Sequence, residues 1–216
     1  MNFALRRRAL IAAQKEYIIP PEYREIESLT FTGDQWFDTG IHLNNNTRIE
    51  IDITPTVSPT STTCFYWGAY DGTIYSGLVQ TKNVLTIRYF YGQRTGDSNF
   101  ETITYNSTGE FLQQKVIDTN GENYFDINGQ RLLITTQHTF AISLTAYFGS
   151  CNRTDGEYPA YFISRKSKWY EDGTTLSRFY VPVRRLSDDV GGMFDVVNNT
   201  FNPSMTSTPF VKGADV

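Results

Sequence analysis

The sequence predicts an all-β fold, a two-sheet antiparallel sandwich with a short helical or extended arm at its N-terminus. Aromatic residues are the first observation, because the 216-residue chain holds 14 Tyr and 15 Phe, and such residues favour pleated, half-buried surfaces. Short alternating segments are the second, separated by turn residues about every 8–12 positions, as in sandwiches. Length is the third: a chain of about 200 residues buries roughly 70 % of its unfolded surface, so the fold needs no metal or disulfide.

Turn dipeptides and alternation place the strands. Residues 48–53 alternate isoleucine with charged residues, which indicates a strand with one buried face. Asp71-Gly72 is a strong turn signal, and Asn120-Gly121 is the strongest hairpin signal in the chain. The other expected strands are 65–70, 74–79, 84–91, 101–105, 114–119, 124–127, 130–134, 140–148, 160–170 and 176–183.

Residues 1–22 are expected to form a separate arm, and residues 23–216 the β-domain. The first sixteen residues are rich in Ala, Leu and Arg, which favour helix, and Pro20-Pro21 then forms a stiff, extended connector. The apolar run after the arginines is shorter than the about 7–15 residues that a signal peptide needs, and no stretch approaches the about 20 of a membrane span. We therefore expect the arm to dock on a partner through Phe3, Arg6, Arg7, Arg8, Leu10 and Ile11.

Two motifs bracket the β-domain. Residues 26–41 read IESLTFTGDQWFDTGI, and residues 178–201 read RFYVPVRRLSDDVGGMFDVVNNTF. Together they resemble the opening and closing motifs of laminin-G-like, concanavalin A-type jelly rolls, which are common in bacteriophage virion proteins and in proteins of gut bacteria. The resemblance covers roughly residues 23–212 and implies a concanavalin A-like jelly-roll sandwich. In the closing motif, Gly191-Gly192 is expected to turn the chain so that one edge is closed by Met193, Phe194 or Val196, and Phe201.

The resemblance also implies a biological setting. It is typical of a non-enzymatic virion protein, such as a head decoration, fibre or tail component, made in the bacterial host cytoplasm and then incorporated into the virion. Its expected partners are other virion proteins, bound through the arm, a host glycan and further copies of the chain. The net charge of −4 argues against nucleic acid, since phosphate binding needs a basic surface. No cofactor and no membrane are expected. A bacterial cell-surface adhesin is an alternative, opposed by the missing signal peptide.

Aromatic residues are the candidate glycan ligands. Sugar binding uses flat rings against the apolar face of a pyranose, with polar groups for the hydroxyls. A polar loop follows the expected strand 84–91, and loops at sandwich ends often carry sites. The competing interpretation is that these rings fill the core or pair across strands. The candidate ligand-binding residues are Trp67, Tyr70, Tyr89, Tyr91 and Arg94.

One motif invites a catalytic interpretation. Glu50 and Asp52 match the first half of the Glu-x-Asp-x-x-Glu signature of jelly-roll glycoside hydrolases, which need two carboxylates flanking the scissile bond. The second glutamate would stand at position 54 or 55, where this chain has Thr54 and Pro55. A glycoside hydrolase or lyase is therefore the opposed alternative, and no catalytic residue is expected.

The remaining reactive side chains are expected to have structural roles. The two cysteines lack CxxC spacing, so two buried thiols are favoured over a disulfide. The acidic turn residues lack the spacing of an EF-hand, and solvated turn acids are favoured over a calcium site. The two histidines have no nucleophile beside them. No metal is expected. The residues concerned are Cys64, Cys151, Asp34, Asp188, Asp189, His42 and His138.

Overall fold

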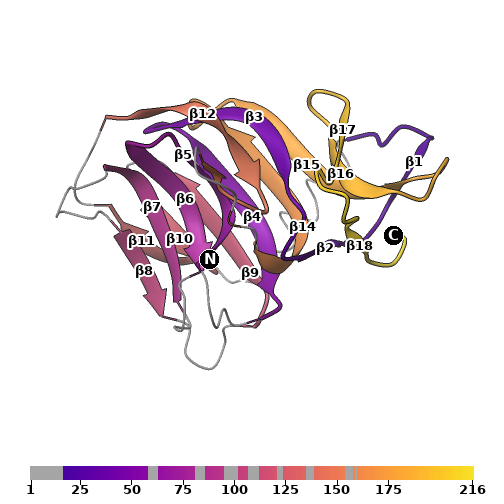
Figure 1. The fold of residues 1–216 in the computed structure, drawn as a ribbon, viewed down its shortest axis with the longest axis horizontal. Helices are drawn as coiled ribbons and strands as arrows, with labels where there is room; N and C mark the ends of the chain where they lie inside the picture. The colour runs from indigo at the N-terminus through magenta and orange to yellow at the C-terminus, as the bar shows by residue number, and fades with distance from the viewer. Residues whose placement is uncertain are drawn as a thin grey trace.

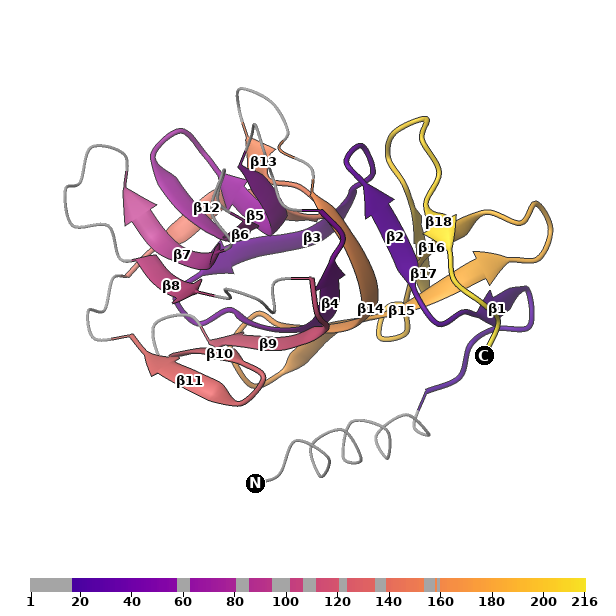
Figure 2. The ribbon, with the colours of Figure 1, turned by 90° about the horizontal axis from the view of Figure 1, so that it is seen from below.

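The computed structural model describes residues 17–57, 63–80, 86–94, 102–106, 112–120, 124–134, 139–153, 158 and 160–216. Within these ranges the chain forms β1 to β18 and no helix. The strands make two sheets, which form the two layers of a sandwich (Figures 1 and 2). Neighbouring strands are antiparallel, except for the short parallel pair of β13 with β5. The all-β sandwich expected from the sequence is confirmed.

The larger sheet has eleven strands, in the order β11-β10-β9-β4-β14-β15-β16-β17, with β1, β2 and β18 attached at the side. Its strands β1, β16, β17 and β18 project beyond the smaller sheet at one end of the molecule (Figure 1). The strands are β1 (Tyr23–Glu25), β2 (Leu29–Thr32), β4 (Arg48–Pro55), β9 (Lys115–Asn120), β10 (Tyr124–Ile127), β11 (Gln130–Leu133), β14 (Tyr161–Tyr170), β15 (Leu176–Arg185), β16 (Gly191–Asp195), β17 (Thr200–Pro203) and β18 (Val211–Lys212).

The smaller sheet has seven strands, in the order β3-β12-β5-β6-β7-β8, with β13 paired to β5. Its consecutive strands β5 to β8 form a meander, and β3 and β12 continue the sheet on the other side of β5. The strands are β3 (Phe37–Asn44), β5 (Cys64–Tyr70), β6 (Ile74–Gln80), β7 (Thr86–Arg94), β8 (Thr102–Asn106), β12 (Ala141–Phe148) and β13 (Asn152–Arg153).

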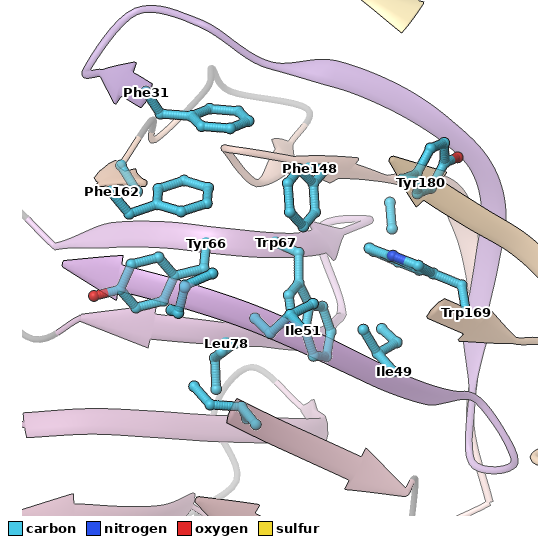
Figure 3. Packing of buried hydrophobic residues seen from close by; sticks show 14 of the residues in the cluster. Phe31, Ile49, Ile51, Tyr66, Trp67, Leu78, Phe148, Phe162, Trp169 and Tyr180 are labelled. Atoms are coloured by element: carbon cyan, nitrogen blue, oxygen red, sulfur yellow. The ribbon is translucent and has the colours of Figure 1, made fainter. Parts of the chain in front are cut away.

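Aromatic rings fill the space between the sheets. Trp67 of β5 and Trp169 of β14 meet edge to face across the layers, with centroids 5.8 Å apart. Phe31 stacks on Phe162 at 4.2 Å, and Phe148 packs edge to face on both (Figure 3). Burying one such ring contributes about 1.5–3 kcal/mol. The alternation at β4 confirms the expected half-buried strand, because its isoleucines face this core and its charged residues face out.

The closing motif differs from the expectation at its glycines. Gly191 and Gly192 do not turn the chain: they begin β16, and the turn lies before them at 186–188. A glycine is needed at 192 because the Phe201 ring lies against it, and an added Cβ would meet that ring at 2.6 Å. Phe201 lies on β17, the last strand of the sheet path, and stacks on Tyr23 at 5.2 Å.

One residue of the expected arm contacts the sandwich. Tyr17 lies within the expected arm, yet its ring packs edge to face on Phe179 of β15 at 5.2 Å. Its hydroxyl donates to Glu25 at 2.9 Å and is contacted by Lys166 Nζ. Tyr17 therefore belongs to the sandwich. The docking residues expected between positions 3 and 11 lie outside the described residues.

Two smaller expectations concern the thiols and the membrane. Cys64 and Cys151 are both buried and are not joined in a disulfide, so the two-thiol prediction is confirmed. Among the residues that the structure describes, no helix has the length and apolar character to cross a bilayer.

Candidate functional site

Three of the candidate ligand rings lie in the core. Trp67, Tyr89 and Tyr91 are 1 %, 2 % and 0 % exposed. Tyr89 packs on Trp67, Tyr91 and Phe125 with centroids 5.7–5.9 Å apart. These rings therefore fill the core, as the competing interpretation expects, and their faces are turned away from the surface.

The pleat and a bulge explain these positions. Tyr89 and Tyr91 share a face, as the period of two requires, but that face points inward. Phe90 points outward instead. In β5 the register shifts between Phe65 and Trp67, and this bulge turns the side chains of both Tyr66 and Trp67 toward the core.

The outer face of the smaller sheet carries the fourth candidate, Tyr70. Its ring is 9 % exposed and belongs to a cluster separate from the core between the sheets. We call this group the outer aromatic cluster. Its other rings are partly exposed, apart from the more deeply buried Phe65. The cluster consists of Phe65, Tyr70, Tyr75, Phe90, Tyr158 and Arg153.

Stacking and a central cation organise the cluster. Tyr70 and Tyr75 face each other across the β5–β6 pair and stack at 3.7 Å with 6° between their planes. Arg153 Cζ lies 4.9 Å, 5.4 Å and 4.5 Å from the ring centroids of Tyr70, Tyr75 and Tyr158. Each such cation–π contact contributes about 0.5–1 kcal/mol at an exposed site. The rings are therefore held in fixed positions before any ligand binds.

Two glycines leave room for the cluster. Gly68 and Gly77 are directly paired between β5 and β6, and Phe65 lies over them. A Cβ added at either position would come within 3.0 Å of the Phe65 ring. The sequence thus keeps this part of the sheet free of side chains, so that an aromatic ring can lie directly on the backbone.

A second stack extends the outer face toward β3. Trp36 and Tyr147 stack at 4.1 Å with 13° between their planes, and both are partly exposed. Tyr147 lies directly opposite Gly68 of β5, so this stack and the outer aromatic cluster occupy the same face. The Asp38 carboxylate accepts a hydrogen bond from the Thr145 hydroxyl at 2.9 Å beside it. The face therefore offers aromatic surfaces and hydrogen-bonding groups together.

The fifth candidate, Arg94, is the last residue of β7. Its backbone pairs with Ile74 of β6. Its side chain lies outside the described residues, so its predicted role stays a prediction.

The carboxylates of the hydrolase-like motif lie on the outer face of the larger sheet. Glu50 accepts a hydrogen bond from Arg48 at 2.6 Å and from the Tyr170 hydroxyl at 3.3 Å. Asp52 is paired with Arg165 at 3.3 Å, and the same guanidinium donates to Thr54 at 3.1 Å. The Thr54 hydroxyl therefore accepts a hydrogen bond from Arg165, close to where the signature has its second glutamate.

Acidic turn residues are paired with cations as well. Asp188 forms a bidentate pair with Arg185, and Asp189 is bound by Lys212 and Arg184. These hydrogen bonds lower the pKa of both carboxyls. In the part of the chain that the structure describes, no three His, Cys, Asp or Glu side chains gather as metal ligands would.

Comparison with known proteins adds no relative. No family model matches the chain, and no curated protein is recognisably similar to it. The evidence for a site is therefore the geometry of this chain itself.

Sequence reasoning missed most of the outer aromatic cluster. Tyr75 had a partial signal, because Asp71-Gly72 predicts a hairpin here, but a two-residue turn would set Tyr70 opposite Thr73 and not opposite Tyr75. Tyr158 and Arg153 had none, since Arg153 lies on the two-residue strand β13, whose parallel pairing with Tyr70 of β5 has no local signal, and Tyr158 lies outside the named strands.

Proposed function

We propose that the protein is a non-enzymatic bacteriophage virion protein, such as a head decoration, fibre or tail component, whose concanavalin A-like jelly roll binds a host glycan. The resemblance of residues 26–41 and 178–201 to virion jelly rolls supports the virion part of this proposal. The outer aromatic cluster with the Trp36–Tyr147 stack carries the glycan part.

The physical basis is stacking on preorganised rings. A pyranose presents one apolar C–H face and a rim of hydroxyls, and flat aromatic side chains next to polar groups match both. Tyr75, Tyr158 and Trp36 are partly exposed and fixed by stacking or by Arg153. Because these side chains lose little further freedom on binding, little of the binding energy is spent on ordering them.

We infer that the protein is not an enzyme from the hydrolase-like motif, which lies on the larger sheet. Glu50 and Asp52 are each hydrogen-bonded to an arginine, and no carboxylate stands at position 54 or 55. A retaining hydrolase needs a nucleophile and a separate proton donor, and the second glutamate that would donate the proton is replaced here by Thr54 or Pro55.

A glycan array on the purified full chain tests the proposal. Tyr75→Ala should abolish the glycan signal that the unaltered chain gives. Tyr124→Ala is the matched control, because Tyr124 is also a partly exposed tyrosine, lies on the outer face of the other sheet, and has Arg131 Cζ 3.7 Å from its ring centroid. Equal loss of binding in both variants, or binding untouched in Tyr75→Ala, would refute a site on this face.

The virion part needs its own test. Mass spectrometry of density-purified particles from a phage that encodes this chain should find the protein at a constant number of copies per particle. Its absence from washed particles, with presence in the lysate, would contradict the proposal.

A further inference from the structure

An open, shallow depression of about 550 Å³ lies at one end of the sandwich, apart from the outer aromatic cluster. The turn between β3 and β4, the turn after β14 and the start of β12 surround it. Its volume falls within the about 300–1,000 Å³ typical of small-ligand sites. Its lining includes Asn44, Asn45, Asn46, Ile74, Phe140, Ala141, Glu171 and Asp172.

The walls of the depression are held in place before any ligand binds. Asn44 Oδ1 accepts from the Asn46 amide at 2.8 Å, and the Asn44 amide donates to Thr47 Oγ1 at 3.0 Å. Asp172 Oδ1 accepts the backbone amides of the turn that follows, at 2.5 Å and 2.9 Å. The two turns touch, since a Cβ added at Gly173 would lie 3.0 Å from the Asn46 carbonyl oxygen.

The chemistry of the lining points to a hydroxyl-rich ligand. Three consecutive asparagines supply amide groups that both donate and accept, and two carboxylates accept from hydroxyls. Phe140, Ile74 and Ala141 form the apolar part of the lining, where C–H groups can pack. Among the described lining residues there are two acidic side chains and no cationic one. This combination favours an uncharged ligand over an anionic one.

We propose that this depression is a second binding site, which takes a neutral saccharide of one or two sugar rings. The site is independent of the outer aromatic cluster. The asparagines and carboxylates bind the hydroxyls, and the apolar lining contacts the C–H face of the ring. The negative charge of Glu171 and Asp172 selects against sugars that carry a carboxylate.

Amide NMR of the full chain tests this, with methyl glucoside, methyl galactoside and methyl mannoside as neutral probes and glucuronate and galacturonate as anionic ones. At least one neutral probe should shift the side-chain amides of Asn44–Asn46 and the Gly173 amide at concentrations up to about 50 mM. The uronates should bind at least about fivefold more weakly, because of repulsion by two nearby carboxylates. No shift with any neutral probe, or equal binding of the uronates, would overturn the proposal.

A paired variant isolates the charge effect. Glu171→Gln together with Asp172→Asn removes both charges and keeps one oxygen acceptor on each side chain. The amide oxygen that replaces the Asp172 carboxylate can still accept from the Thr174 and Thr175 amides, so uronate binding should rise to match the neutral sugars. Unchanged discrimination in this variant would overturn the assignment of selectivity to these residues. Tyr75→Ala should leave the shifts intact, so this site and the proposed glycan face can fail separately. Loss of the shifts in Tyr75→Ala would show that the probes bind the aromatic face instead.

Discussion

Tyr17 gives the sharpest test of where the folded domain begins. The sequence assigned this residue to a separate arm, whereas the structure packs it on the outer face of the larger sheet. Two variants of the full chain separate its interactions. Tyr17→Phe removes only the hydroxyl, and Tyr17→Ala removes the ring as well. Both should lower the free energy of unfolding if the residue is part of the domain.

The expected magnitudes follow from the contacts. The hydroxyl donates to the Glu25 carboxylate at 2.9 Å in a partly buried setting, which is worth about 1 kcal/mol net. The ring adds an edge-to-face pair with Phe179 at 5.2 Å, about 0.5–1.5 kcal/mol, and lies 5.0 Å from Lys166 Nζ, a cation–π contact of about 0.5–1 kcal/mol. We therefore expect a loss of about 1 kcal/mol for Tyr17→Phe and about 2–3 kcal/mol for Tyr17→Ala.

Thermal and urea unfolding measure both losses. For a domain of this size, about 1 kcal/mol corresponds to a Tm change of roughly 2–4 °C, so Tyr17→Ala should lower the Tm by about 4–12 °C. Ile18→Ala is the matched control, because the neighbouring Ile18 is 88 % exposed and should change stability by less than about 0.5 kcal/mol. If Tyr17→Ala melts like Ile18→Ala, the packing of Tyr17 does not stabilise the fold and the domain begins later.

Three further outcomes are expected. Burial raises the pKa of Tyr66 and Tyr180 above the ordinary value of about 10. Below about pH 10 both tyrosines are protonated in the folded and in the unfolded chain, so their contribution to stability is fully present there. Above about pH 10 the unfolded chain loses protons that the folded chain keeps, so the urea midpoint should fall. A midpoint that stays flat into strongly alkaline buffer would contradict this. Gly192→Ala should cost about 1–3 kcal/mol, because the added Cβ meets the Phe201 ring at 2.6 Å, and an unchanged Tm would show that the ring moves freely aside. Incubation with laminarin or mixed-linkage glucan should release no reducing ends, and release that disappears in Glu50→Gln would establish an enzyme instead.

Local patterns predicted the strands well because each strand carries its own signal. The alternation at β4 and the turn at Asn120-Gly121 depend on neighbouring residues only, and both β4 and the β9–β10 pair form as expected. The sheet order has no such local signal. β4 lies between β9 and β14, whose residues are far away in the sequence, and backbone pairing is the same whichever strand is the neighbour.

The site was harder to predict because both faces of the smaller sheet are aromatic. Alternation shows that Tyr89 and Phe90 point to opposite sides, but it does not say which side faces the core. In most sandwiches the face with apolar side chains is the one that packs in the core. Here the more polar Tyr89 faces the core, and the apolar Phe90 faces out. The bulge in β5 then reverses the parity beyond Trp67, so a count from Tyr70 back along the strand places Trp67 correctly but fails for Tyr66, which faces in instead of out.

The two outer faces of the sandwich differ in a way that fits the proposed function. Tyr17, where the basic N-terminal segment joins the described chain, lies against Phe179 and Lys166 on the outer face of the larger sheet. Tyr75 and Trp36 lie on the outer face of the smaller sheet. Because the outer faces of a two-layer sandwich point in opposite directions, attachment through the N-terminal segment leaves the aromatic face turned away from the attachment surface. A label at Tyr17 should therefore be protected by docking onto the virion, whereas one beside Tyr75 should stay accessible to solvent and to a glycan. The reverse pattern would contradict both the attachment through the arm that the sequence predicts and the display of the aromatic face.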